Sequence, residues 1–184
     1  MAAWKWILFI YYFLPINGQI LNMMKPKTIR VHKFSTCPGH EKDLLVVKNV
    51  QIAFSNRINL ISAQVLIRET LHEDIKIKLV LNRCKSREAL DSCEKYQNIN
   101  MNHFCGILND DNKPWSPFLK MCDPPFACPF KKGVYSFRNG TFDGSAVGHL
   151  PVSGWYWIVT AFMVGEKSDR TLGCVNFDGQ IVSA

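Results

Sequence analysis

The segment Trp155-Tyr-Trp-Ile-Val-Thr-Ala-Phe-Met-Val164 decides the fold class of this chain. Its aromatic and β-branched residues favour a strand, in which successive side chains point to opposite faces. Both faces are apolar, although a strand with one wet face would carry a polar residue at every second position. Either the strand is central and covered on both sides, or one of its faces lines an internal cavity. One face carries Trp155, Trp157, Val159, Ala161 and Met163, and the other carries Tyr156, Ile158, Phe162 and Val164.

Outward from this segment, further strands are expected where short apolar runs are bounded by Gly, Asn, Asp or Pro. Residues 75–82 alternate apolar and polar side chains with a period of two, which is typical of a half-buried strand. The other expected strands are 44–54, 60–67, 133–137, 154–164 and 172–182, with a turn at 56–59 and short helical turns at 86–96 and near 102–108. Because no amphipathic helix separates the strands, the chain is predicted to be one all-β domain, an antiparallel β-cup or immunoglobulin-like sandwich.

The composition indicates one secreted globular domain. The chain has 184 residues, of which 47% are hydrophobic and 20% charged, and its net charge is +7. Residues 1–18 combine Lys5, an apolar core at 7–14 and a cleavable end at Gly18, which is the pattern of a signal peptide. That core is shorter than the ~18 residues that a membrane-spanning helix needs. We therefore expect a signal peptide at 1–18 and a secreted domain at 19–184, with disulfides formed in an oxidising compartment.

Several motifs surround the cysteines. The most specific are the CPFKKGVYS stretch that begins at Cys128 and the RTLGC stretch that ends at Cys174. The others are His103-Phe104-Cys105, Leu150-Pro151 and Gly154-Trp155-Tyr156, with Phe34, Cys37, Cys84 and Cys93 upstream in the same order. Together these motifs resemble the ML lipid-recognition superfamily, and in particular its ganglioside-activator branch, over roughly 34–182.

Carried over residue by residue, the resemblance implies the disulfides Cys37–Cys174, Cys84–Cys93 and Cys105–Cys128. The family has a fourth disulfide, but Phe126 stands where its second cysteine would be, so Cys122 lacks its partner. Cys122 is then a free thiol, a link between two chains, or a competitor of Cys128 for Cys105.

The resemblance also implies a function. The family fold is a β-cup, two sheets splayed around an apolar cavity that holds acyl chains. The protein would take up a glycolipid or a related lipid at a membrane surface and present it to a glycosidase, in the lysosome or outside the cell, with no reaction or cofactor of its own. Family members also act as extracellular carriers of chemosensory, sterol or microbial lipids without a hydrolase partner, and both readings stay open. The residues expected to line the cavity are Val50, Ile52, Phe54, Val65, Ile67, Leu79, Trp157 and Phe162.

The stretch between Cys105 and Cys128 carries large apolar side chains among several prolines, which excludes a regular strand or a long helix. Loops lie on the surface and normally carry few large apolar side chains. Trp115, Phe118 and Leu119 are therefore expected either to fold back as a lid on the core or to form the mouth of the cavity at a membrane or ligand entrance. In both cases this loop is the candidate for a mobile gate.

A basic stretch near the start of the mature chain is a candidate for docking on anionic membranes, or else a solvated arm that aids solubility. Histidines gain charge as the pH falls, so binding to anionic liposomes is predicted to tighten from pH 7 to pH 5 and to weaken with salt. The secretory route disfavours nucleic acid as a ligand. The basic stretch contains Lys25, Lys27, Arg30, His32 and Lys33, and the histidines are His32, His40, His72, His103 and His149.

Catalytic and metal-binding patterns are weak. The sequence has no Gly-x-Ser-x-Gly, His-Glu-x-x-His or P-loop pattern, so no enzymatic activity is expected. His103-Phe-Cys105 and residues 37–40 contain metal-ligand types, but no second pair has zinc-finger spacing, so no metal site is expected. The sequon Asn139-Gly140-Thr141 predicts a glycosylated surface turn.

Overall fold

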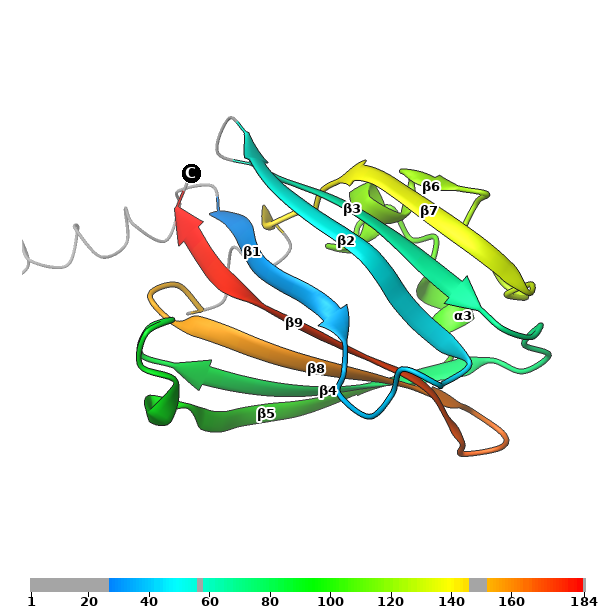
Figure 1. Ribbon diagram of the computed structural model, residues 1–184. Helices are drawn as coiled ribbons and strands as arrows, with labels where there is room; N and C mark the ends of the chain where they lie inside the picture. The colour runs from blue at the N-terminus through cyan, green and yellow to red at the C-terminus, as the bar shows by residue number, and fades with distance from the viewer. Residues whose placement is uncertain (1–26, 56–57, 146–151, 184) are drawn as a thin grey trace, which may run out of the picture.

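The computed structural model describes residues 27–55, 58–145 and 152–183, which fold into two facing antiparallel sheets (Figure 1). The predicted signal peptide, Lys25, His149 and the Leu150-Pro151 pair lie outside these residues. The five-stranded sheet has the order β1 (Lys27–Thr36), β9 (Thr171–Ser183), β8 (Tyr156–Gly165), β4 (Ile75–Cys84) and β5 (Glu94–Met101). The four-stranded sheet has the order β2 (Leu45–Ser55), β3 (Ile58–Ile67), β7 (Gly133–Gly140) and β6 (Cys122–Asp123). The predicted all-β antiparallel sandwich is confirmed.

Three helical turns complete the described residues: η2 (Leu90–Ser92), α3 (Phe104–Ile107) and α4 (Ser116–Leu119). Among the described residues, no helix has both the length and the apolarity that a membrane crossing requires.

The core lies between the sheets and follows the period of two in the strands. On β3, Ile61, Ala63, Val65 and Ile67 are buried, whereas the residues between them are partly exposed. On β4, Ile75 and Ile77 are buried and face the same cluster. Alternation therefore places one apolar face of each sheet against the other sheet.

Side chains join the two sheets along one edge. The side-chain oxygen of Asn59, a buried residue of β3, accepts the backbone N–H of Val31 at 2.9 Å, and its amide donates to the Val31 carbonyl at 3.1 Å. At the other end of the same edge, the Thr36 hydroxyl accepts the Val47 N–H at 2.8 Å and donates to the Val47 carbonyl at 3.0 Å. The backbones of the two sheets approach each other here, between β1 or β9 on one side and β2 or β3 on the other. We call this edge the seam.

The opposite side of the sandwich is spanned by the segment 102–132. Its helix α3 contacts β4 of the five-stranded sheet, and its helix α4 contacts β7 of the four-stranded sheet. The disulfide between Cys105 and Cys128 ties the two ends of this segment together. The segment therefore bridges the sheets on the side away from the seam.

The three disulfides implied by the resemblance are all present. Cys37–Cys174 joins residues 137 positions apart, and a loop of this length corresponds to about 5 kcal/mol of stabilisation in the chain-entropy description. Cys122 is free and half-buried. Burial raises the pKa of its thiol to about 12.

Three sequence predictions need correction. The basic stretch is not a solvated arm over its described part, because Lys27–Thr36 forms edge strand β1. Its apolar residues Ile29 and Val31 pack inward, and Lys33 is exposed. The short helical turn predicted within 86–96 is present as η2, but strand β5, which the sequence patterns do not predict, begins at Glu94 and pairs with β4. The exposed Asn139 lies at the end of β7 and not in a turn, with its N–H bonded to the Ser62 hydroxyl at 3.0 Å.

Candidate functional site

The inner face of the five-stranded sheet is only partly covered at its centre. Ala161 lies on β8, the middle strand, and pairs in register with Leu79 on β4. Both residues pack against the core cluster, yet both stay partly exposed, as does Met101 at the end of β5. Residues at such positions in a tight sandwich would be buried like Ile77. Water therefore reaches the inner face at Ala161, Leu79 and Met101.

Most of the predicted wall residues lie on inner faces. Val65, Ile67 and Trp157 are buried, whereas Val50, Ile52 and Leu79 are partly buried. Val50, Ile52 and Leu79 pack against the core cluster. Their role in binding a ligand stays a prediction.

Phe162 lies on the other face of β8. Its neighbours Ala161 and Met163 pack against the core, so alternation turns Phe162 outward, where its ring lies 6.0 Å from that of His40. Trp157 has the same orientation as Ala161 and faces inward. Phe162 and Trp157 therefore cannot line one cavity, and Phe162 must be removed from the wall between the sheets.

Phe54 lies at the end of β2 and is 53% exposed. The guanidinium of Arg30 sits 4.5 Å from the centre of its ring. Together with Ile52, these residues line a pocket of about 350 Å³ that opens at the seam. Two of the predicted wall residues thus border an opening on the seam side.

The aromatic residues of the segment 102–132 fold back on the core. Phe118 is buried, and its ring stacks between Phe137 and Phe142 with centroid separations of 4.6 and 5.0 Å. Trp115 is half-buried against Phe104 and donates its ring N–H to a backbone carbonyl at 3.3 Å. Of the two alternatives left open by the sequence, the lid on the core is the one observed for these side chains.

One end of the sandwich gathers exposed apolar side chains, and we call it the hairpin end (residues 54, 55, 58, 83–96 and 152–157). Val31, Trp157 and Arg83 stand in one register row across the five-stranded sheet, and Asn59 joins Val31 to the β2–β3 hairpin. The β2–β3 hairpin and the β4–β5 hairpin therefore lie at the same end of the sandwich. The large apolar residues exposed there are Phe54, Ile58, Leu90 and Tyr96.

Arginine side chains lie over aromatic rings at this end. The Arg83 guanidinium lies 5.2 Å from the centre of the Tyr96 ring and 4.6 Å from the centre of the Trp155 ring. The pair of Arg30 and Phe54 lies on the other side of the hairpin end, at the seam. The Arg83 guanidinium also bonds Glu94 at 2.6 Å. Cations held against aromatic faces and next to exposed apolar groups are suited to a membrane–water boundary.

Two inner-face features escaped the sequence analysis. Ile99 and Met101 alternate with Asn98 and Asn100, so a period of two marks β5, but no strand is predicted for these residues in the sequence analysis. Ala161 was assigned to an apolar face and not to the wall, because its exposure depends on how far the second sheet stands from it.

The chain was compared with known proteins. No family model matches it, and no curated protein matches its sequence. Among solved structures it is similar to chicken MD-1 in complex with lipid IVa, with 14% sequence identity and a TM-score of 0.41 over 85% of this chain and 97% of that chain. The likeness is a distant one.

Proposed function

We propose that this protein binds a lipid non-enzymatically, with the acyl chains held between the two sheets. The observation that carries the proposal is the partial exposure of Ala161 and Leu79 on the inner face of central strands. An apolar inner face that water can reach is an incompletely filled core. Such a face gains free energy when a hydrocarbon replaces the water.

Exchange with a membrane is the natural way to load such a site. Burying an acyl chain contributes ~0.8 kcal/mol per CH₂, and removing it from a bilayer costs about the same. Transfer is then close to neutral, and contacts outside the cavity decide which lipid is taken. No covalent bond needs to be broken.

The hairpin end is the surface that we assign to membrane contact. Its exposed residues Phe54 and Ile58 can enter the headgroup region, while Arg30 attracts anionic lipids. This assignment moves the expected entrance away from Trp115 and Phe118, which are packed against other residues.

The finer assignment follows the sequence motifs. We propose that the ligand is a glycolipid or related lipid, presented to a glycosidase in the lysosome. The alternative is an extracellular carrier of small hydrophobic ligands that has no hydrolase partner. Stimulation of glycosidase turnover on membrane-bound glycolipid by the purified protein separates the two.

Lipid analysis of the secreted protein tests the binding itself. Mass spectrometry of solvent extracts should find lipid in a fixed molar ratio with the wild type. Ala161→Trp should fold but lose this lipid, because the indole occupies the open space between the sheets. Thr160→Trp places the same side chain on the outer face of the same strand and should retain it. A wild type without lipid, or equal loss in both variants, would refute the proposal.

A further inference from the structure

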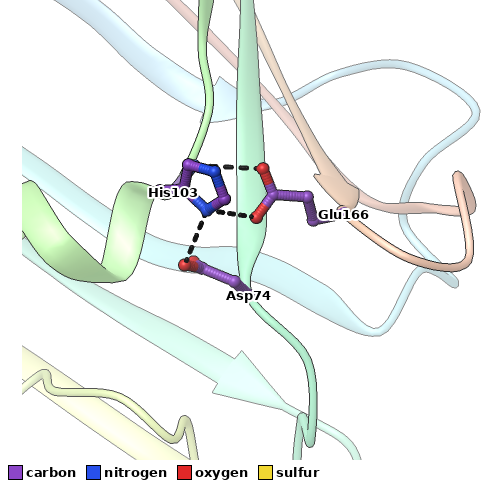
Figure 2. Close-up of side chains that lie close together, drawn as sticks. All are labelled: Asp74, His103 and Glu166. Carbon is purple, nitrogen blue, oxygen red and sulfur yellow. Dashed lines mark hydrogen bonds and ion pairs between the residues drawn. The ribbon is translucent and has the colours of Figure 1, made fainter.

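Three segments that are distant in sequence meet at the end of the sandwich opposite the hairpin end. Asp74 precedes β4, His103 precedes α3, and Glu166 follows β8. Figure 2 shows the imidazole of His103 facing both carboxylates. Its Nδ1 lies 3.0 Å from Glu166 Oε2 and 3.8 Å from Asp74 Oδ2. One nitrogen and two carboxylate oxygens therefore converge on one point, all within 4.8 Å of one another.

Backbone donors hold each carboxylate by its other oxygen. Asp74 Oδ1 accepts the N–H groups of Ile75 at 2.7 Å and Cys105 at 3.0 Å. Glu166 Oε1 accepts the N–H of His103 at 3.3 Å, and the Glu166 N–H bonds the Asp74 carbonyl at 2.9 Å. The second oxygen of each carboxylate is thereby oriented toward the imidazole. Such support from backbone groups is typical of metal ligands.

We propose that Asp74, His103 and Glu166 bind a Zn²⁺ ion. Two ligand atoms 2.0–2.1 Å from a tetrahedral zinc are about 3.3 Å apart, and the separations of 3.0 and 3.8 Å bracket this value. A nitrogen with two carboxylate oxygens suits zinc, whereas Ca²⁺ takes six to eight oxygen ligands. Cys105 and Cys37, the cysteines considered in the sequence analysis, are in disulfides and contribute no thiolate.

The site is open on one side. The His103 side chain is 80% exposed, so an ion can enter from solvent and keep a water molecule as its fourth ligand. The ion would supply a positive charge between the carboxylates of Asp74 and Glu166. The bound ion would link the start of the segment 102–132 to the start of β4 and to the loop between β8 and β9.

Zinc titration of the secreted protein tests the site. Isothermal titration calorimetry with ZnCl₂ at pH 7.5 should give one ion per chain, and the affinity should fall at pH 5.5, since the imidazole must be unprotonated to bind. A hundredfold excess of zinc over Kd should raise the midpoint of thermal unfolding by roughly 5–10 °C. MgCl₂ and CaCl₂ serve as controls.

Two variants separate this site from adventitious binding. His103→Ala should weaken zinc binding at least about tenfold, since loss of even an outer-shell partner costs 10–100-fold. His72→Ala removes another exposed histidine from the same end of the molecule and should leave the affinity unchanged. No saturable binding, or equal loss in both variants, would overturn the proposal. So would a melting temperature that is insensitive to zinc.

Discussion

Leu79 of β4 and Ala161 of β8 lie opposite each other in register, on the inner face of the five-stranded sheet, and both stay partly exposed. Two residues along the same strand, Ile77 faces the same way and is buried. The inner face is thus closed near the start of β4 and open at its middle. The difference in exposure between Ile77 and Leu79 indicates how much of the space between the sheets is left unfilled.

Truncation of these residues should have unequal effects. A buried aliphatic residue replaced by Ala loses transfer free energy and leaves a cavity, whereas a residue at a water-accessible space leaves no new void. We expect Ile77→Ala to lower the free energy of unfolding by about 3 kcal/mol and Leu79→Ala by about half as much. Urea titrations of both variants measure the difference, and equal losses would show that Leu79 is enclosed.

Phe118 should behave as a core residue. Its ring is stacked between Phe137 and Phe142, so Phe118→Ala should destabilise the protein by about 3–5 kcal/mol. Trp115→Ala should cost less, because Trp115 is only half-buried. Denaturant unfolding checks the order. If Phe118→Ala keeps the wild-type free energy of unfolding but changes the rate of lipid transfer between vesicles, Phe118 acts as a gate and not as a core residue.

Cys122 should be unreactive in the native protein. Burial raises the pKa of its thiol to about 12, so the reactive thiolate is scarce near neutral pH. Iodoacetamide at pH 8 should label it slowly in buffer and rapidly in denaturant, with mass spectrometry locating the label. Rapid native labelling, or a disulfide-linked dimer on a non-reducing gel, would contradict this.

Glu73 should contribute to the acid dependence of stability. The Ser168 N–H donates to its carboxylate at 2.9 Å, the Ser168 hydroxyl adds a further bond, and the Lys167 N–H donates at 2.8 Å, which together lower the pKa of Glu73. A lowered folded pKa gives stabilisation that is present above pH 4.5, the ordinary value, and is lost as the pH falls toward the folded pKa.

Glu73→Gln should therefore be less stable than the wild type at pH 7, and the gap should narrow below pH 4.5. Urea unfolding across this range measures the gap. A gap that is constant with pH would contradict the assignment to Glu73.

Membrane binding should depend on the hairpin end. Phe54→Ser with Ile58→Ser should reduce binding to anionic liposomes in a co-flotation assay, because each loses apolar contact with the lipid boundary. Met121→Ser removes an equally exposed residue elsewhere and should have no effect. Wild-type binding should tighten from pH 7 to pH 5 and weaken with salt, and insensitivity to both would exclude an electrostatic contribution.

Local patterns in the sequence were enough to predict much of the fold. Short apolar runs bounded by turn residues placed β2, β3, β7, β8 and β9, and a period of two placed β4, because both patterns are properties of a single strand. The three disulfides were implied by the family resemblance that the motifs around the cysteines carry. Edge strands β1 and β5 were missed, since an edge strand carries polar and charged residues that also suit loops.

Other features arise only in the tertiary structure. Whether Ala161 is covered depends on the separation of two sheets, which the seam hydrogen bonds of Asn59 and Thr36 set on one side only. The orientation of the His103 imidazole toward Asp74 and Glu166 depends on three loops that meet at one end of the sandwich. Sequence patterns were enough to place the central strands and their apolar faces. The tertiary structure alone decided how far the faces stand apart and which polar groups converge, because both result from packing between segments that are distant in the chain.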